Sequence, residues 1–297
     1  MIIGLDQFVQ ARRDSDPCGL HDLIQDLCGG DSASGRLINA ESLQRSHVHR
    51  LMLEVNGTAH RLVVKRLSQG HSRVEQLVLT RWLAGADLAH IAPALLGTVL
   101  ESGGSYVWHV YEDLGDAALD QSEQEGIRDR GFLTPLHGEV DRDRIGILIR
   151  LMADLHDRFL DHAQLEEYRC QSVDLGNGFY RNNVHGAIMA LERLGNSEHA
   201  ESRERVDVVN DVLMKLKRLR DQEPWRMEQV EKFGGSPTLL HGDFGVKNAF
   251  VVETAAGFQA KLIDWDHAGV GPVSYDLSTF LMQLPRDERM WSLDCYT

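Results

Sequence analysis

The chain has 297 residues, of which 42% are hydrophobic and 26% are charged. This length and composition indicate one or two globular domains with a sizeable core. The formal net charge of −14 argues against nucleic acid as a partner, because neutralising phosphates requires clustered Lys and Arg. The same charge is compatible with the steering of a cationic ligand, and equally with plain solubility.

The sequence contains no run of 18 apolar residues, so we expect no membrane-spanning helix and no membrane partner. Segment 1–17 carries charges of both signs and lacks the layout of a secretory signal. The cysteines do not have the spacing of a metal site; they are Cys18, Cys28, Cys170 and Cys295. Reduced thiols in a cytoplasmic protein are the favoured interpretation.

Residues 1–35 are predicted to form an N-terminal extension, with a short amphipathic stretch over 22–27 that ends at Gly29-Gly30. Strands are expected next, over residues 36–39, 48–55 and 59–67. Asn56-Gly57 joins the second and third of these, and Asn-Gly between two β-rich runs is a strong signal for a hairpin. The chain therefore begins its main fold with antiparallel strands.

Apolar residues at helical spacing predict a helix over residues 71–84. Two more strands are expected over 94–100 and 106–111, because Ser102-Gly103-Gly104 separates two β-rich runs there. This first half of the chain is therefore strand-rich and contains one main helix.

From about residue 114 the pattern becomes helical. Regular apolar spacing predicts helices over residues 143–162 and 201–222, and the polar segment 164–185 between them is expected to be irregular. A short junction near residues 112–116 connects the two halves.

Three oxygen-bearing side chains stand out near the end of the chain. His241-Gly242-Asp243 is followed by Asn248, and Asp264 lies 21 residues beyond Asp243. Residues 249–252 and 258–263 are predicted to pair as a hairpin, which can return Asp264 to the side of Asn248. A carboxylate and an amide oxygen suit Mg²⁺ held together with substrate phosphates, and a second carboxylate upstream can accept a hydroxyl proton.

This pattern resembles the aminoglycoside phosphotransferase and choline kinase family of small-molecule kinases, which are distant relatives of protein kinases. His-Gly-Asp, four residues and then Asn is the catalytic signature of that family, and it is intact here. The second signature matches Asp264-Trp265-Asp266, Gly271-Pro272 and Tyr275-Asp276-Leu277. Two motifs in the right order at the right distance are a strong signal, and the resemblance covers roughly residues 35–285.

The resemblance implies an α+β, bilobal protein-kinase-like fold, with an antiparallel-sheet N-lobe containing one main helix and a mostly helical C-lobe. The nucleotide-binding N-lobe would comprise residues 1–113, including the extension 1–35. The C-lobe, with the catalytic loop and the acceptor site, would comprise residues 114–297.

The resemblance also implies roles for the three oxygen-bearing residues. Asp243 is expected to be the catalytic base, which orients the acceptor hydroxyl and receives its proton late in phosphoryl transfer. Asn248 and Asp264 are expected to hold the Mg²⁺ ions that bridge the phosphates of ATP. Asp276 is expected to tie down the catalytic loop by hydrogen bonds.

Lys65 ends an apolar strand, and Glu75 follows ten residues later in the next predicted helix. In a kinase, Glu75 holds the ammonium of Lys65, and Lys65 contacts the ATP phosphates. Taken alone, the two residues also fit an ordinary surface lysine and glutamate. Glu101 is an alternative partner for Lys65.

The remaining nucleotide contacts are assigned by the same resemblance. Segment 38–50 is expected to be a loop over the nucleotide, with Ser42 and Ser46 as candidates for the phosphates. The junction is expected to pair with the adenine rim through the backbone of Glu112 and Leu114. Each of these residues also fits a turn or a strand end without any ligand.

The function implied is an ATP-dependent O-phosphotransferase acting on a hydroxyl of a small molecule, with GTP as the alternative donor. An aminoglycoside or other antibiotic is the first expectation for the acceptor, followed by choline-like, amino-alcohol or sugar acceptors. Candidates for the acceptor pocket are Asp266, Glu166, Glu167, Tyr168 and Tyr180. A monomer or a homodimer is expected.

Two other classes remain open. A non-catalytic nucleotide-binding protein can share this fold, although the intact set of Lys65, Asp243, Asn248 and Asp264 argues against it. A protein kinase is disfavoured because Gly242 stands where protein kinases have arginine, and because little chain separates Asp264 from Gly271-Pro272.

Overall fold

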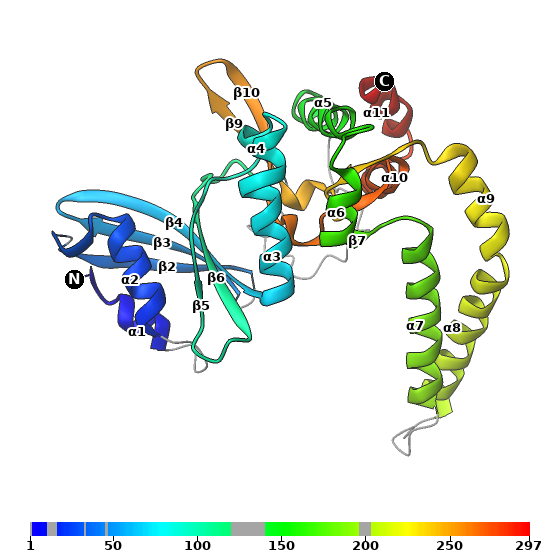
Figure 1. Cartoon of the computed structure of the whole chain (residues 1–297), viewed down its shortest axis with the longest axis horizontal. Helices are drawn as coiled ribbons and strands as arrows, with labels where there is room; N and C mark the ends of the chain where they lie inside the picture. Colours follow the sequence, from blue (N-terminus) through cyan, green and yellow to red (C-terminus); the bar gives the residue numbers. More distant parts are fainter. Residues whose placement is uncertain (1, 11–16, 33, 45–46, 120–139, 196–202) are drawn as a thin grey trace. The chain divides into compact units, whose positions relative to one another are not determined.

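The computed structural model describes residues 2–10, 17–32, 34–44, 47–119, 140–195 and 203–297 (Figure 1). Contacts divide the chain into two compact units. The first, here called the sheet unit, contains residues 1–153, 245–267 and 283–297, and the second, the helical unit, contains residues 154–244 and 268–282. The predicted functional boundary after residue 113 stays a prediction, because these units follow packing and not function.

A six-stranded sheet forms the centre of the sheet unit, in the order β1-β2-β3-β4-β6-β5. Its strands are β1 (Ile2–Ile3), β2 (Gly35–Gln44), β3 (Val48–Val55), β4 (Thr58–Ser68), β5 (Leu95–Leu100) and β6 (Tyr106–Glu112). All neighbours pair antiparallel except β1 and β2, which are parallel. The strands predicted over 48–55, 59–67, 94–100 and 106–111 are therefore confirmed.

The turn between β3 and β4 shows why its sequence was informative. Asn56 and Gly57 have φ angles of 52° and 78°. A two-residue hairpin turn that matches the twist of its strands requires positive φ at both positions, which Asn and Gly tolerate. The predicted hairpin is confirmed.

The expected loop over residues 38–50 is wrong for most of its length. β2 continues to Gln44 and β3 begins at Val48, with Ser42 opposite His49 across the ladder. This polar segment has the composition of a loop. It is nevertheless a strand, because hydrogen bonds to β3 satisfy its backbone and these bonds do not require apolar side chains. Irregular register occurs between Leu37 and Asn39 and between Ser42 and Gln44.

The core of the sheet unit lies between the sheet and the N-terminal helices α1 (Leu5–Gln10) and α2 (Pro17–Leu27), followed by the short η1 (Gly30–Ser32). The helices contribute Leu5, Phe8, Leu20 and Ile24, and the strands contribute Leu51, Leu53, Val64, Trp108 and Val110. Figure 1 shows both helices beside the sheet at the blue end of the chain. Burial of these side chains from water holds the N-terminal segment on the sheet.

The predicted helix over 71–84 is confirmed, with one irregularity. It consists of α3 (Gln69–Leu77), a π-helical turn η2 (Val78–Trp82) and α4 (Leu83–Gly85), and η3 (Ala89–Ile91) follows. Ser68 caps its start by accepting a hydrogen bond from the amide of His71 at 3.4 Å. Single π-turns are rare within helices and are not signalled by apolar periodicity.

The predicted second hairpin is also confirmed. β9 (Ala249–Thr254) and β10 (Gly257–Leu262) pair antiparallel, with Ala249 opposite Leu262. They are preceded by η4 (Val246–Asn248) and followed by η5 (Trp265–His267). This hairpin belongs to the sheet unit.

A three-stranded sheet in the order β7-β11-β8 lies in the helical unit. Its strands are β7 (Val173–Asp174), β8 (Pro237–Leu240) and β11 (Gly269–Pro272). The helical unit also contains α6 (Leu165–Gln171), α7 (Asn177–Gly195), α8 (Arg203–Asp221), α9 (Glu223–Phe233) and nearly all of α10 (Ser274–Gln283). The helix α5 (Arg142–Phe159) begins in the sheet unit and ends in the helical unit, and α11 (Glu288–Tyr296) belongs to the sheet unit. Helices predicted over 143–162 and 201–222 are confirmed as α5 and α8.

The expectation of an irregular segment over 164–185 is wrong, because α6, β7 and the first half of α7 occupy it. The sequence is polar there because many of these side chains are exposed or half-exposed. Packing against neighbouring elements stabilises such helices, and a weak apolar stripe is enough for that. Figure 1 shows α7 and α8 lying side by side as an antiparallel pair.

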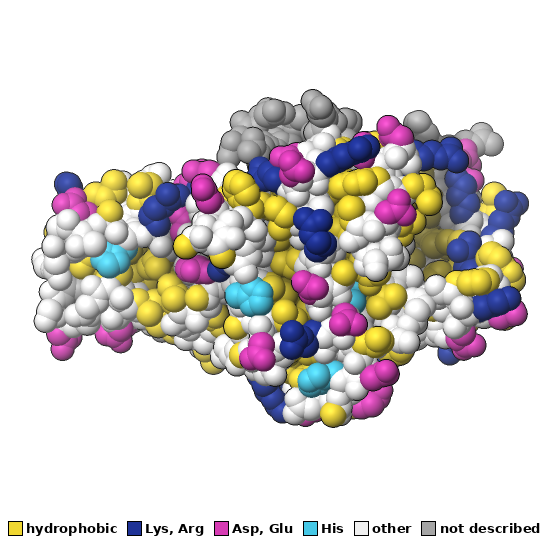
Figure 2. Space-filling model, turned by 90° about the horizontal axis from the view of Figure 1, so that it is seen from above, with side chains coloured by type: hydrophobic (Ala, Val, Ile, Leu, Met, Phe, Trp, Pro, Cys, Tyr) yellow, Lys and Arg dark blue, Asp and Glu magenta, His cyan; other side chains and the backbone are white. Residues whose placement is uncertain are grey.

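The surface carries both signs of charge. Acidic and basic side chains are interspersed over the face seen in Figure 2. Within the described ranges, no helix is both long enough and apolar enough to span a bilayer. The architecture is α+β, with a curled antiparallel sheet in one half and mostly helices in the other, as predicted.

Candidate active site

The ammonium of Lys65 is the centre of a group of charged side chains in the sheet unit. Lys65 lies on β4, and its Nζ is 3.0 Å from Oε2 of Glu75 on α3. The same Nζ hydrogen-bonds Asp264 and lies 3.5 Å from Oδ2 of Asp266. The fold therefore brings together Lys65, Glu75 and Asp264, which the sequence assigned to one site, and it adds Asp266.

The alternative partner, Glu101, is engaged elsewhere. Its carboxylate accepts two hydrogen bonds from the guanidinium of Arg66, at 2.6 and 2.8 Å. Such a two-point contact matches the planar geometry of both groups. Glu75 is therefore the partner of Lys65.

Burial and the neighbouring opposite charges shift the pKa values of Lys65 and Glu75 in opposite directions. Burial by itself lowers the pKa of Lys65, but Glu75, Asp264 and Asp266 together raise it above its ordinary value. Burial raises the pKa of Glu75 to about 7, although Lys65 opposes this shift. At pH 8, three carboxylates therefore surround one ammonium. This excess of negative charge suits an additional cation.

The backbone of Asp264 is unusual. Its φ angle is 68°, in the left-handed region that residues other than glycine seldom adopt but that Asp tolerates better than most. Such a conformation costs on the order of 1 kcal/mol and persists where the surrounding structure imposes it. Here it follows the last residues of the β9–β10 hairpin and directs the carboxylate to Lys65.

Asn248 lies beside the residue that precedes Asp264. The amide of Ile263 donates a hydrogen bond to the backbone oxygen of Asn248 at 2.9 Å, and Asn248 is buried. The hairpin thus makes neighbours of two segments that each carry an oxygen ligand. Among the described residues, no group of three or more His, Cys, Asp or Glu side chains is arranged to hold a metal. An amide and a carboxylate with phosphate oxygens are nevertheless a suitable donor set for Mg²⁺.

Glu112 ends β6 at the predicted nucleotide junction. Its carboxylate accepts hydrogen bonds from Nζ of Lys261 at 2.7 Å and from the amide of Ala94 at 3.1 Å. The side chain therefore anchors the junction to β10 and to the segment before β5, and the backbone amide of Glu112 also donates to the oxygen of Ala94 at 3.1 Å. The predicted backbone contacts of Glu112 and Leu114 stay predictions.

Arg50 is a structural residue of the junction that the sequence did not single out. From β3 it contacts Asp113 at 3.1 Å, Asp116 at 2.8 Å and the backbone oxygen of Gly115 at 2.8 Å. Its side chain is 12% exposed. The sequence shows an arginine and, further along, a segment with two aspartates. Only the position of β3 beside that segment shows that they form ion pairs.

Ser42 does not lie beside Lys65. It is an exposed residue of β2, and β3 separates β2 from β4 in the sheet. Two strand spacings correspond to about 10 Å. Its contact with phosphates stays a prediction, and Ser46 lies outside the described residues.

The loop that carries Asp243 is built within the helical unit. The buried carboxylate of Asp276, on α10, accepts hydrogen bonds from the amides of His241 at 2.7 Å and Gly242 at 3.0 Å. Gly242 has a φ angle of 82°, which glycine adopts without strain. The amide of Asp243 donates to Nδ1 of His241 at 3.3 Å. Asp276 therefore fixes the loop, as expected, and His241 braces it.

Replacing Asp276 by asparagine should destabilise the helical unit by about 2 kcal/mol or more, because the amide nitrogen would face one of the two backbone donors. The measurement is the midpoint of urea unfolding, followed by circular dichroism. Asp221→Asn, the same change at an exposed site on α8, should cost less than about 0.5 kcal/mol. Equal midpoints for the two variants would contradict the anchoring role.

Two of the candidate acceptor residues are used within the fold. Tyr168 is buried, stacks on His162 and donates its hydroxyl to Gln164 at 2.8 Å. The hydroxyl of Tyr180 donates to the backbone oxygen of Leu219 at 3.1 Å, between α7 and α8. The place of these tyrosines in the acceptor pocket stays a prediction.

A different aromatic pair includes Tyr275, which lies near the loop that carries Asp243. Tyr275 packs edge-on against Phe179, with ring centroids 5.9 Å apart. Burial raises the pKa of Tyr275 to about 12, with further contributions from the charges of Asp276 and Asp243. Tyr275 belongs to the second sequence motif, but only the packing of the chain shows that it lies close to these two carboxylates.

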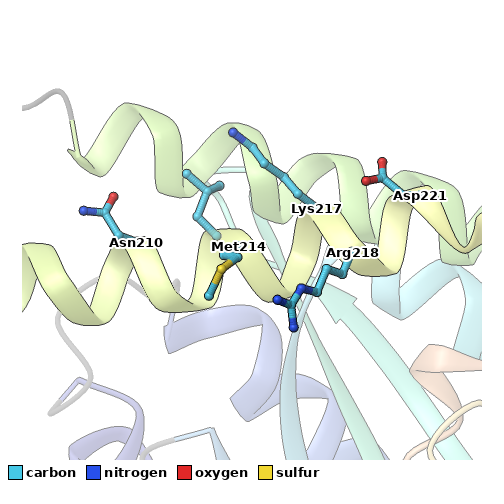
Figure 3. Close-up of a pocket in the computed structure, with 6 residues that line it drawn as sticks. Asn210, Met214, Lys217, Arg218 and Asp221 are labelled. Carbon is cyan, nitrogen blue, oxygen red and sulfur yellow. The ribbon is translucent and has the colours of Figure 1, made fainter.

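A separate hollow of about 340 Å³ lies along α8 and is lined by Asn210, Leu213, Met214, Lys217, Arg218 and Asp221. Figure 3 shows these side chains projecting from one helix, with mixed polar and apolar character. None of the residues that the motifs assign to catalysis or nucleotide binding lines it.

The sheet unit with its lysine–glutamate pair, and the loop anchored by an aspartate, are features of phosphotransferases with a protein-kinase-like fold. The model of the phosphotransferase enzyme family matches residues 46–292. The chain belongs to this family. It is accordingly a phosphotransferase that acts on a hydroxyl group of a small molecule.

Solved structures support the fold. The crystal structure of aminoglycoside-3'-phosphotransferase of type VIII matches with a TM-score of 0.52 and 19% identity, over 93% of this chain and 90% of that chain. Spectinomycin phosphotransferase in complex with ADP and spectinomycin matches with a TM-score of 0.52 and 11% identity, over 88% and 75%. The AMP-bound complex of spectinomycin phosphotransferase matches with a TM-score of 0.51 and 10% identity, over 88% and 76%. No curated protein sequence matches this chain.

Proposed function

We propose that this chain transfers the γ-phosphoryl group of ATP to a hydroxyl of an aminoglycoside or another antibiotic. The observation that carries the proposal is the meeting of Lys65 with Glu75 and Asp264 in the sheet unit. These residues come from a strand, a helix and the segment after a hairpin, and a kinase needs this set to hold nucleotide phosphates. GTP is the alternative donor.

Lys65 would contact the phosphates, and Glu75 would hold its ammonium in place for that contact. Asn248 and Asp264 would hold Mg²⁺, which supplies neutralisation of the phosphate charge when bound. Asp243 would orient the acceptor hydroxyl and take its proton late. Catalysis of this kind consists of positioning and electrostatic stabilisation, and this chain's residues supply both.

The proposed class of acceptor is supported by the charge of the chain and by its similarity to solved structures. The net charge of −14 favours a cationic acceptor over an anionic one through long-range attraction. Two similar structures are of enzymes named for aminoglycoside and spectinomycin phosphorylation, which makes antibiotics the first acceptors to test. Choline, amino alcohols and sugars are the alternatives. A cytoplasmic location and a monomeric or homodimeric state stay predictions.

Release of ADP from Mg·ATP in the presence of a panel of acceptors tests the proposal. The panel contains aminoglycosides, spectinomycin, choline, amino alcohols and sugars, with parallel assays in GTP. We expect at least one cationic acceptor to stimulate release, and the stimulation to disappear in Asp243→Asn.

Nucleotide binding should be measured on the same preparation by calorimetry. Tight binding of Mg·ATP without stimulation by any acceptor would support the non-catalytic nucleotide-binding alternative. Absence of nucleotide binding would overturn the proposed site itself.

A further inference from the structure

A chain of buried polar side chains continues behind the Lys65–Glu75 pair. Ser72 and Glu75 lie three residues apart on α3, and His109 and Tyr111 lie two residues apart on β6. Residues at these spacings point to the same side of a helix and of a strand. All four side chains are buried, with at most 5% of their surface exposed.

The four side chains are joined by consecutive hydrogen bonds. Oγ of Ser72 lies 2.7 Å from Nε2 of His109, and Nδ1 of His109 lies 2.8 Å from the hydroxyl of Tyr111. Burial raises the pKa of Tyr111 well above its ordinary value, and so do the charge of the nearby Glu75 carboxylate and a hydrogen bond to it. Glu75 in turn accepts a hydrogen bond from Lys65 at 3.0 Å. The polar groups of α3 are therefore connected through β6 to the ammonium of Lys65.

The direction of each bond follows from the number of protons available. An ionised carboxylate only accepts, so at pH 8 Tyr111 donates its single proton to Glu75. The oxygen of Tyr111 must then accept from His109, which requires the proton of the neutral imidazole to be on Nδ1. Nε2 is left as an acceptor for the hydroxyl of Ser72.

His109 has the charge state that this arrangement requires. Burial and, to a smaller extent, the charge of its cross-strand neighbour Lys65 lower the pKa of His109 to about 4, although the charge of Asp266 opposes this shift. The imidazole is therefore neutral at neutral pH, with one donor and one acceptor. Every member of the chain has a partner, and shifting α3 away from β6 would leave buried polar groups unpaired, which is unfavourable.

We propose that Ser72, His109 and Tyr111 are positioning residues that hold the Glu75 carboxylate, and through it Lys65, ready for the phosphates of a nucleotide. This inference rests on the proposed nucleotide site and extends it by three residues. Tyr111 acts directly on Glu75. His109 donates from Nδ1 to the oxygen of Tyr111, and Ser72 donates its hydroxyl proton to Nε2 of His109.

Tyr111→Phe tests the first of these contacts, because it removes one hydroxyl and keeps the ring. We expect the KM for ATP to rise about tenfold, as for loss of a hydrogen bond to a charged group, with the KM for the acceptor unchanged. Tyr106→Phe is the matched control on the same strand, where the tyrosine is 38% exposed, and its KM for ATP should equal that of the wild type. Equal KM values for the two variants would overturn the role of Tyr111.

Two changes at His109 separate hydrogen bonding from packing. Asparagine retains a donor near the position of Nδ1, whereas leucine fills similar space and has none. His109→Asn should therefore bind Mg·ATP more tightly than His109→Leu, measured by calorimetry on variants whose circular dichroism matches the wild type. Equal affinities would overturn the role of the His109 hydrogen bonds.

The tautomer of His109 gives a readout that does not depend on activity. In protein labelled with ¹⁵N-histidine at pH 8, long-range ¹H–¹⁵N spectra should show His109 protonated on Nδ1, with its signals assigned by their loss in His109→Asn. Protonation on Nε2 would overturn the proposed direction of the chain. If the wild type binds no nucleotide, the proposed function fails, whereas the tautomer still reports on the hydrogen bonds.

Discussion

Replacing Asp243 by asparagine is expected to lower kcat about a thousandfold while leaving the affinity for Mg·ATP within about twofold of the wild type. Asparagine is similar in shape and keeps the backbone contact to His241, but it can neither accept the hydroxyl proton nor attract it with a full charge. Asp276 would still hold the amides of His241 and Gly242, so the loop should keep its conformation. The loss would therefore be confined to the chemical step.

Steady-state kinetics with the best acceptor and calorimetry with Mg·ATP measure the two quantities. Asp221→Asn makes the same chemical change at an exposed position of α8 and should leave both unchanged. A kcat of Asp243→Asn within about tenfold of the wild type would remove this residue as the base. A parallel loss of nucleotide affinity would instead indicate damage to the nucleotide site.

Replacing Asp264 by asparagine is expected to raise the Mg²⁺ concentration needed for half-maximal activity by on the order of tenfold or more. The change removes one negative charge and one strong oxygen ligand at the end of the β9–β10 hairpin. Asparagine also tolerates the positive φ angle of this position, so the backbone should not need to move. Lys65 would keep Glu75 as its partner.

Asp266→Asn provides the matched comparison for this prediction, because it makes the same change two residues later beside the same ammonium. Asp266 accepts a hydrogen bond from His267 at 2.6 Å, and this bond together with Lys65 keeps the pKa of Asp266 low against the effect of burial. Its replacement should change the Mg²⁺ requirement much less than that of Asp264. The reverse order would assign the metal ligand to Asp266.

Local features were predictable because their physical causes lie within a few residues. Asn56-Gly57 specified a hairpin because those residues adopt positive φ at low cost. The hairpin after Asn248 followed from its β-rich runs and the turn between them, and it brought the segment of Asp264 beside Asn248 as expected. The two motifs and their spacing were sufficient to indicate the family, which the match over residues 46–292 establishes.

Segments whose structure depends on neighbours were misjudged. The end of β2 was expected to be a loop because its residues are polar, but its backbone is hydrogen-bonded to β3. Residues 164–185 looked irregular because α6 and α7 are partly exposed. In both cases packing against another element stabilises the segment, and the pattern of residues within the segment does not reveal that element.

The sequence by itself determined the family and the residues from which its chemistry is proposed, because a signature of fixed spacing lies in consecutive residues. Only the tertiary structure decided that Glu75 and not Glu101 pairs with Lys65, and that Asp266 joins them. It also placed the buried side chains of Ser72, His109 and Tyr111 in a row of hydrogen bonds behind the pair. These outcomes depend on the pairing of β4 with β6 and on α3 lying against β6, and burial then makes each partner necessary because an unpaired polar group there is costly.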